Sequence, residues 1–431
     1  MGVEARPWQR RHTMVGLTFL ACIIAYTDRV NISVAAVAMK EELGWSQTEK
    51  GLVLSSFFIG YMLFMLAGGW LAERYGGKRV LGLAVLAWSL FTLLTPPAAA
   101  ISLTALIVVR IGMGMGEAAM FPAAFDLFGR WVPASERATA VARLLSGIPI
   151  GTLAGLMVTG WLVGNLGWPS AFYSFGVLGL LWSLWWFAKA SNDPAVDPRV
   201  SAQERALLQR DRPDAGADES MSWRKLLRSV PVWSMVSAHF ATTWTLYVLL
   251  SWLPSYFREV QGLSIANAGM FSAAPWLAML VVSNLAAGIS DRMIGRGVSV
   301  TRARKLMQCT SLLGSAGFLL ATRYADSPML ALVLLCGATG ALGCAFSGYA
   351  PNALDISPRH SGMLVAFSNT FATIPGIVGV AITGWLVDVT GTYSAAFLLT
   401  ASVSVLSAAF YATAFSARPI DLRLSTTGET A

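Results

Sequence analysis

Apolar runs of about 20 residues, separated by short polar stretches, recur along almost the whole chain. A run of that length is long enough for a helix to cross the hydrocarbon core of a bilayer. The pattern therefore predicts an all-α membrane protein with twelve spanning helices. We place these helices at residues 13–38, 50–72, 79–97, 101–128, 138–165, 169–189, 231–256, 266–290, 304–322, 328–351, 362–387 and 393–415.

A polar stretch at 190–230 is the one long interruption of this pattern, and it leaves six predicted helices on either side. We therefore expect an N-terminal six-helix bundle at 1–190, a cytoplasmic linker at 191–229 and a C-terminal six-helix bundle at 230–431.

The linker contains one predicted helix. Ser201 and Glu204 have the spacing of a capping box ahead of an apolar pair, a pattern that begins short helices. The Asp-, Pro- and Gly-rich segments 193–198 and 211–219 have the composition of a flexible linker.

Two short phrases of sequence recur at an offset of 224 residues. Thr-Gly-Trp-Leu-Val occurs at 159–163 and again at 383–387, near the end of the fifth predicted helix of each half. Each is followed by a similar segment that starts at Gly167 or at Gly391. Parallel repeats of this kind predict two bundles related by an axis along the membrane normal, with a substrate site between them near mid-depth.

Composition supports the membrane assignment. Of 431 residues, 55% are hydrophobic and 13% are charged, against about 25% charged in a typical soluble domain. The formal net charge of +8 raises the question of nucleic-acid binding, but the distribution of charge argues against it. On one side the predicted loops carry four basic residues, Lys40, Lys50, Arg258 and Arg323. The loops and termini of the other side carry sixteen: Arg6, Arg10, Arg11, Arg74, Lys78, Arg79, Arg130, Arg137, Arg292, Arg296, Arg302, Arg304, Lys305, Arg359, Arg418 and Arg423. This asymmetry places both termini and the linker in the cytoplasm.

No metal or cofactor is expected, because the four cysteines have neither metal-ligand spacing nor the pattern of a disulfide framework. The start of the chain lacks the cleavage site of a signal peptide and the composition of a transit peptide, so its apolar run is interpreted as the first spanning helix. These features favour the inner (plasma) membrane of a bacterial cell.

Four charged residues interrupt predicted spanning helices. Asp28 and Arg29 lie in the first helix, and Arg110 and Glu117 lie in the fourth. An ion at the centre of a bilayer costs about 2.5 kcal/mol or more, so such residues usually face a cavity and have a function. Arg110 and Glu117 are seven residues apart and therefore share one face of their helix.

Two roles remain open for these four residues. In the first, Asp28 pairs with Arg110, or Arg29 pairs with Glu117, and the pairs hold helices together. In the second, the two guanidinium forks bind carboxylate or phosphate oxygens, and the two carboxylates exchange protons. Protonation of a carboxylate then releases its Arg for an anion, which couples proton uptake to anion binding.

The fourth helix also carries Gly112, Gly114 and Gly116 between its two charges. These glycines predict that a neighbouring helix, or a substrate, approaches the backbone closely. A Gly-x-Gly-x-Gly run also occurs in nucleotide-binding loops, but no strand precedes this one, so we reject that interpretation.

The stretch G-G-W-L-A-E-R-Y-G-G-K-R at 68–79 resembles the loop signature of the major facilitator superfamily, with Glu73 where the signature normally has Asp. A weaker echo, G-I-S-D-R, follows the second helix of the other half. The resemblance implies that these side chains lock cytoplasmic helix ends together, whereas the alternative is that they are ordinary positive-inside charges. The implied gating-loop residues are Gly69, Glu73, Arg74, Gly77, Arg79, Asp291 and Arg292.

Within that superfamily, the chain resembles the anion:cation symporter family, which includes bacterial sugar-acid importers and phosphate, sialic-acid and vesicular glutamate transporters. The resemblance covers nearly the whole chain, and its most specific segments are 26–33, 55–69, 110–122, 355–362 and 368–376.

This resemblance implies that Asp28 and Glu117 couple protons and that Arg29 and Arg110 face the anion. It also implies substrate contacts at Tyr26, Tyr61, Ser347 and Asn369. For the hydroxyl groups of Tyr61 and Ser347, helix packing or an internal hydrogen bond is an equal alternative.

The seventh predicted helix differs from one branch of that family. Vesicular glutamate transporters have an Arg there, where this chain has Ala241–Trp244, and the difference weakens glutamate as a substrate. Trp244, beside Thr242 and Thr243, is the tryptophan best placed to stack on a sugar-like ligand. His239 is interpreted as a buried neutral histidine rather than as an additional proton carrier.

We therefore expect a secondary active transporter that acts as a monomer. It would import a small organic anion, such as a hexonate or hexuronate, with protons by alternating access. Inorganic phosphate or an aromatic acid is the alternative within the same class. A drug:proton antiporter is more distant, because Arg29 and Arg110 disfavour a cationic substrate. The chain has no catalytic or metal-ligand constellation, so an enzyme is not expected.

Overall fold

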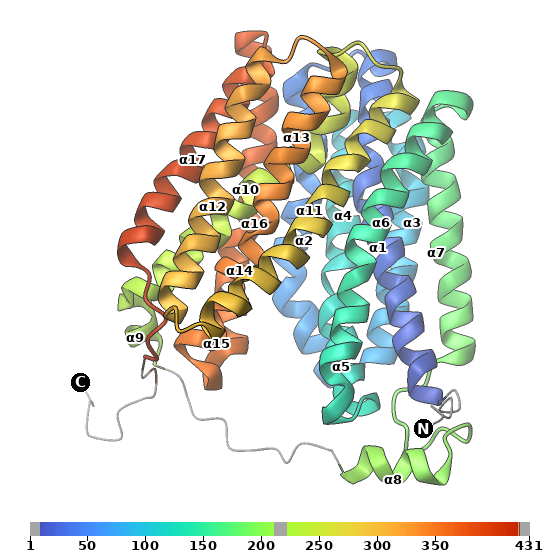
Figure 1. Ribbon diagram of the computed structural model, residues 1–431. Helices are drawn as coiled ribbons and strands as arrows, with labels where there is room; N and C mark the ends of the chain where they lie inside the picture. Colours follow the sequence, from blue (N-terminus) through green and yellow to red (C-terminus); the bar gives the residue numbers. More distant parts are fainter. Residues whose placement is uncertain (1–8, 211–221, 421, 423–431) are drawn as a thin grey trace, which may run out of the picture. The chain divides into compact units, whose positions relative to one another are not determined.

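The computed structural model describes residues 9–210, 222–420 and 422, and within these ranges every regular element is a helix (Figure 1). Ten helical segments of this part of the chain are long and apolar enough to cross a membrane. The helices at the two other predicted positions, 231–256 and 304–322, fall outside that group of ten, so the count of twelve spans stays a prediction. The predicted flexible segment 211–219 and the basic residues Arg6 and Arg423 lie outside the described residues.

The chain divides into two compact units, which we call unit 1 (Met1–Ala35 and Ser56–Gly216) and unit 2 (Ala36–Ser55 and Ala217–Ala431). Two long helices, α1 (Arg10–Leu43) and α2 (Gln47–Tyr75), contribute residues to both units. The other helices of unit 1 are α3 (Gly77–Ile101), α4 (Leu103–Ala118), α5 (Met120–Trp131), α6 (Arg137–Leu166), α7 (Pro169–Lys189) and α8 (Ala202–Arg210). Those of unit 2 are α9 (Trp223–Arg228), α10 (Val230–Glu259), α11 (Ile265–Gly295), α12 (Val300–Ala321), α13 (Pro328–Gly343), α14 (Ala345–Gly348), α15 (Asn352–Ile356), α16 (Ser361–Thr390) and α17 (Tyr393–Ala414).

The repeated phrases end helices in the same way in both units. Helix α6 stops before Gly167, and helix α16 stops before Gly391. Both glycines have a positive φ, 81° and 69°, a backbone conformation that residues with a side chain rarely adopt. The sequence repeat therefore corresponds to a repeated helix end, after which the chain reverses into α7 or α17.

Two predicted helices are interrupted in the structure, so the prediction of continuous helices at 101–128 and 328–351 is wrong in detail. The first is broken at Ala119, between α4 and α5. Pro122 follows the break, and it has no N–H to donate to the carbonyl group of Ala118. The second is divided into α13 and α14, and Pro351 immediately precedes the next helix, α15.

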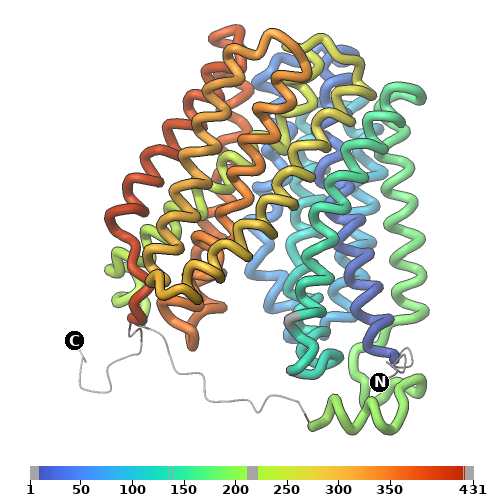
Figure 2. Tube along the Cα trace, in the orientation of Figure 1, coloured from blue at the N-terminus to red at the C-terminus, as the bar shows by residue number. Residues whose placement is uncertain are grey.

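The predicted linker helix is confirmed as α8. Ser201 caps it, because its Oγ accepts a hydrogen bond from the backbone N–H of Glu204 at 3.1 Å. The Glu204 side chain does not complete the capping box but accepts from the backbone N–H groups of Arg10 (3.2 Å) and Arg11 (2.9 Å). Figure 2 shows α8, in green, next to the N-terminal end of α1, in dark blue. Glu204 therefore caps α1 rather than its own helix.

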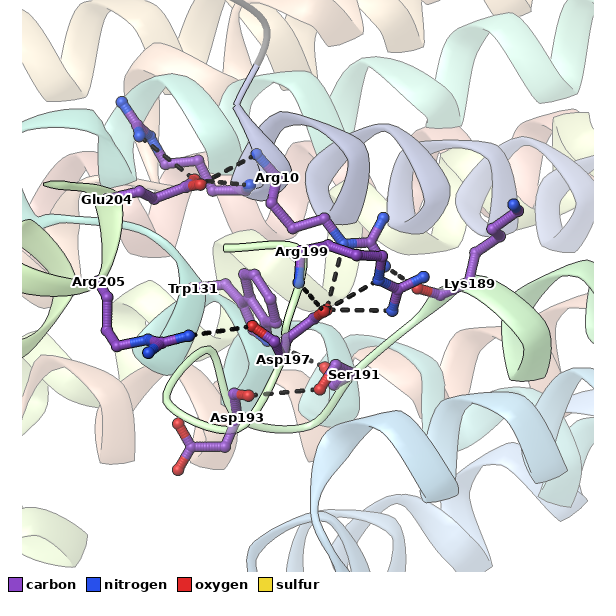
Figure 3. Close-up of polar contacts among 10 residues, drawn as sticks. Arg10, Trp131, Lys189, Ser191, Asp193, Asp197, Arg199, Glu204 and Arg205 are labelled. Atoms are coloured by element: carbon purple, nitrogen blue, oxygen red, sulfur yellow. Dashed lines mark hydrogen bonds and ion pairs between the residues drawn. The ribbon is translucent and has the colours of Figure 1, made fainter. Parts of the chain in front are cut away.

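In place of the flexible segment predicted at 193–198, the structure has an anchored turn around Asp197 (Figure 3). This carboxylate is 1% exposed and accepts hydrogen bonds from Nε of Arg199 (2.9 Å) and Nε of Arg10 (3.2 Å). Burial by itself raises the pKa of Asp197, but the hydrogen bonds from Arg199 and Arg10 outweigh it and hold the pKa below its usual value. The ion pairs thus fasten the segment after α7 to the start of α1.

Candidate functional site

The four charged residues of the predicted spanning helices are all buried within unit 1. Asp28 is 0% exposed, Arg110 and Glu117 are each 1% exposed, and Arg29 is 8% exposed. They come from α1 and α4, and none of them faces lipid. The formal charges of the two cations and the two carboxylates in this buried region cancel when both carboxylates are ionised.

Arg29 is enclosed by one carboxylate and three aromatic rings. Its guanidinium forms an ion pair with Glu117. The same group lies over the rings of Tyr26 (4.6 Å), Phe57 (5.0 Å) and Tyr61 (5.0 Å). Arg29 therefore has a carboxylate partner and cation–π contacts that favour the charged form. Of the two pairings considered for the four charges, the structure contains the one between Arg29 and Glu117.

Arg110 has much weaker partners. Its Nη1 donates to the thioether Sδ of Met113 at 3.0 Å, and its guanidinium lies 5.5 Å from the centre of the Phe57 ring. Its Nε–H group is buried and has no hydrogen-bond acceptor among the described residues. The Asp28–Arg110 ion pair that the sequence left open is not among the ion pairs of these residues. Arg110 therefore retains donors that an anion can occupy.

Among the described residues, Asp28 is a carboxylate without a basic partner in contact. Neither of its oxygens makes a hydrogen bond of good geometry with the described residues, although the indole of Trp88 interacts with the carboxyl group. Asn31, three residues on along α1, is also fully buried, with both polar atoms of its amide unpaired within that part of the chain. Unpaired buried polar atoms are costly, and they concentrate here on α1.

The glycines of α4 bring neighbouring helices close, as their positions predicted. A Cβ on Gly114 would lie 2.0 Å from the backbone oxygen of Phe57 in α2. A Cβ on Gly112 would meet the ring of Phe91, and one on Gly116 would meet Trp88, both in α3. This packing positions Phe57 and Trp88 beside the charges. The sequence pattern did not single out either ring, because an apolar aromatic residue in an apolar helix carries no signal of its own.

The predicted contacts of unit 2 lie on three different helices. Trp244 of α10 is 6% exposed and packs on the backbone at Gly379 of α16. Ser347 of α14 is buried, and its carbonyl oxygen accepts from Arg304 at 3.1 Å. Asn369 lies half-buried on α16. Their role in binding stays a prediction.

His239 is held in place by two neighbours in unit 2. Its Nδ1 is 2.8 Å from Oγ of Ser368, and its ring stacks on Tyr349 with the centres 4.4 Å apart. No acidic side chain is among these contacts. The environment is consistent with the interpretation of His239 as a structural histidine.

Lys50 is not a loop residue, as the count of loop charges assumed, but a fully buried residue in the first turn of α2. Within unit 2, its Nζ donates to Glu259 (2.8 Å) and to Ser255 (3.0 Å) of α10. Glu259 also accepts from the hydroxyl of Tyr393 at 2.7 Å. The sequence did not indicate this burial, because a charged residue at a predicted helix start is usually exposed.

The predicted gating loop contains one tight helix junction. Gly77 donates its N–H to Asp126 of α5 at 2.7 Å, and Asp126 also pairs with Arg130 at 2.9 Å. A Cβ on Gly77 would lie 2.3 Å from the carbonyl oxygen of Ala123. The start of α3 is therefore joined to α5 through an acidic residue that the sequence pattern did not single out.

Five of the other predicted gating-loop residues are exposed. The guanidinium of Arg74 lies over the exposed rings of Trp70 (5.5 Å) and Tyr75 (5.8 Å). Glu73 and Arg79 are exposed. In unit 2, Asp291 and Arg292 are exposed too, and Gly69 of α2 is half-buried.

Comparison with known proteins places the chain among membrane transporters. The model of the Major Facilitator Superfamily matches residues 18–303. Over 386 residues the chain is 39% identical to sodium-dependent phosphate transport protein 1, chloroplastic, of Arabidopsis thaliana, covering 89% of this chain and 75% of that protein. It is 39% identical to probable anion transporter 1, chloroplastic, of Oryza sativa subsp. japonica, covering 89% and 73%. It is 37% identical to the ascorbate transporter, chloroplastic, of Arabidopsis thaliana, covering 89% and 72%.

Solved structures with the same fold include two transporters. A bacterial homologue of the human lysosomal transporter Spinster superposes with a TM-score of 0.76 at 18% identity, covering 93% of this chain and 96% of that one. The D-xylose–proton symporter superposes with a TM-score of 0.73 at 14% identity, covering 95% and 99%. At these identities the likeness concerns the fold.

Proposed function

The chain belongs to the anion:cation symporter-like family of the major facilitator superfamily, and from this premise we propose that it is a proton-coupled symporter of a small organic anion. The substrate is a sugar acid, such as a hexonate or hexuronate, or a similar carboxylate. Transport proceeds by alternating access, with Arg29 and Arg110 binding the anion and Asp28 and Glu117 carrying protons.

The observation that carries this proposal is the state of Arg110. Its guanidinium is 1% exposed, yet in the described structure its contacts are a thioether and an aromatic ring. A buried cation without a hydrogen-bonded counter-ion is costly, and a bidentate carboxylate would remove that cost. The anion is therefore the partner that Arg110 lacks.

Coupling to protons follows from the Arg29–Glu117 ion pair. While Glu117 is ionised it occupies Arg29. When Glu117 is protonated, Arg29 is left with an uncompensated charge in a region that water does not reach. A carboxylate anion restores neutrality, so proton and anion favour each other's binding. Asp28 provides a second carboxylate in the same region.

The named relatives support an anionic substrate and keep one alternative open. The ascorbate transporter is named for an organic anion derived from a sugar, and the proposed substrate, a sugar acid, belongs to the same chemical class. The phosphate transport protein favours inorganic phosphate as the second choice, because phosphate oxygens also match a guanidinium fork. The name of that relative includes sodium, so sodium is the rival coupling ion.

The test is transport by purified protein in liposomes. Hexonates, hexuronates, ascorbate, aromatic acids and phosphate are supplied outside in turn, with either a proton or a sodium gradient. Proton influx triggered by one sugar acid, without any need for sodium, supports the proposal. Phosphate-driven flux, strict sodium dependence, or export of cationic drugs in exchange for protons would each replace it.

The remaining assignments are part of the same proposal. We place the protein in the inner membrane of a bacterial cell as a monomer, whereas the chloroplast location belongs to the named relatives. Trp244, Ser347 and Asn369 would contribute substrate contacts from unit 2. Substitution of each by Ala, followed by measurement of anion affinity, tests these three assignments.

A further inference from the structure

A long apolar groove lies on the surface of unit 1, on a different face from the charged site. Its cavity volume is about 530 Å³, within the usual range for ligand pockets. Its lining comes from α2, from α3 and from the stretch 112–119 at and just after the end of α4; we call the α2 and α3 residues its walls and 112–119 its floor. Arg79 and the hydroxyl of Tyr75 are the polar groups of a lining that is otherwise made of apolar side chains and glycine.

The floor of the groove is the back of the helix that carries the candidate site. The buried charged face of α4 contains Arg110, Glu117 and the residues between them on the same side. The groove is lined instead by the opposite face, at Gly112, Met115, Gly116 and Ala119. These residues have the i, i+3, i+4, i+7 spacing of one helix face. Two of these are glycines, and they let the ring of Phe91 and the backbone of Trp88 in α3 lie close against this face of α4.

The length of the groove fits one leaflet of a bilayer. Along α3 the lining runs from Arg79 to Phe91, twelve residue steps apart, which is about 18 Å of helix. The hydrocarbon core of a whole bilayer is about 30 Å thick, so this length exceeds half of it slightly. The groove therefore accommodates an extended chain that starts at one membrane surface and ends near the midplane.

The polar end of the groove lies at the level of lipid headgroups. Trp70 and Tyr75 are 55% and 49% exposed, as expected of aromatic residues at a membrane surface. Arg74 lies over both of their rings. Tyr75 and Arg79 line this end of the groove, and their neighbours in the sequence include the basic residues Arg74 and Lys78 and the acidic residue Glu73.

We propose that this groove binds an acyl chain of an anionic glycerophospholipid from the cytoplasmic leaflet, with the lipid phosphate held by Arg79. The apolar lining takes the chain, and the basic mouth selects the headgroup. Because the chain lies against the back of α4, the lipid supports the helix that positions Arg110 and Glu117. This binding site is separate from the proposed anion site and does not depend on it.

The experiment uses full-length protein in nanodiscs of phosphatidylcholine that contain a minor fraction of photoactivatable phosphatidylglycerol. Labelled peptides are mapped by mass spectrometry. We expect labelling to concentrate on the wall and floor segments 64–91 and 112–119. Photoactivatable phosphatidylcholine should label the same segments more weakly.

Two variants separate the headgroup from the chain. Arg79→Gln should reduce the preference for phosphatidylglycerol about fivefold, the equivalent of about 1 kcal/mol for one basic residue near a membrane surface. Arg302→Gln removes an exposed basic residue of unit 2 and should leave the preference unchanged. Ala87→Phe fills the groove from α3 and should abolish labelling by both lipids, whereas Ala188→Phe, at an exposed position of α7, should not.

If Ala87→Phe does not fold, Leu83→Trp provides the same test from the rim, because Leu83 is 57% exposed and its enlargement disturbs no core packing. Labelling spread evenly over all lipid-facing helices would overturn the proposal. So would equal labelling by the two lipids, or unchanged labelling in the filled variants.

Discussion

Replacing Glu117 with Gln separates proton coupling from anion binding. The Glu117 side chain is fully buried and pairs with Arg29, which also contacts three aromatic rings. Gln has nearly the same shape and keeps an oxygen that can accept from Arg29. The variant therefore fixes the site in the uncharged form that a protonated Glu117 would have, and no proton can leave it.

The expected magnitude follows from the driving force. A gradient of one pH unit stores about 1.4 kcal/mol per proton, which accumulates the anion about tenfold for each proton coupled. Loss of the carboxylate should remove the contribution of that proton while anion exchange between the two sides continues. Outright removal of one partner from a buried ion pair costs about 3–5 kcal/mol of stability, and the retained acceptor should keep the loss below that range.

The assay compares two measurements on the same proteoliposomes. Uptake against a pH gradient reports coupling, and exchange of labelled for unlabelled anion at equal pH reports binding and conformational change. Glu42→Gln, at an exposed position of α1, is the matched control and should resemble the wild type in both. If Glu117→Gln still accumulates the anion fully, or loses exchange as completely as accumulation, Glu117 is not the coupling residue.

Arg110→Lys should weaken anion binding tenfold or more, about 1.4 kcal/mol, because a point charge replaces a bidentate fork; an unchanged affinity by calorimetry would make Arg110 a structural residue. Gly114→Ala should lower the melting temperature, by overpacking worth about 1–3 kcal/mol, because its Cβ would lie 2.0 Å from a backbone oxygen of α2. Gly129→Ala, with open space around it, should not, and equal melting of the two variants would contradict the packing argument. Glu259→Gln should destabilise the protein, by less than the about 3–5 kcal/mol that outright removal of a buried partner costs, because it leaves Lys50 buried without its carboxylate partner, and adding Lys50→Met should restore part of the loss. A double variant that melts no higher than the single one would refute this account of the pair.

Much of the fold could be predicted from sequence because long apolar runs have few alternatives in a membrane. Helices occupy all of the predicted positions within the described residues. The breaks could not be predicted from proline alone, since Pro149, Pro275 and Pro375 lie inside continuous helices while Pro122 follows an interruption. Whether a helix continues past a proline depends on neighbouring groups that satisfy the freed carbonyl, and those are set by tertiary packing.

The candidate site, like the fold, could be predicted from the sequence only in part. A charge within a long apolar run is conspicuous, so the sequence alone is enough to find Asp28, Arg29, Arg110 and Glu117. Which of them pair could not be predicted, because the choice depends on how α1 and α4 pack. The burial of Lys50 was equally hidden, since its carboxylate partner lies more than two hundred residues away along the chain.

The capping of α1 by Glu204 has a consequence for biosynthesis. The first turn of α1 leaves the ribosome long before the residue that accepts its backbone N–H groups, 194 positions later. Until then the start of the first membrane helix has open donors and two arginines without their partners in α8 and the turn around Asp197. Unit 1 is thus completed only after its last membrane helix has been inserted. A fragment that ends at residue 190 would contain every membrane helix of this unit but would lack Asp197 and Glu204, which bind the start of α1.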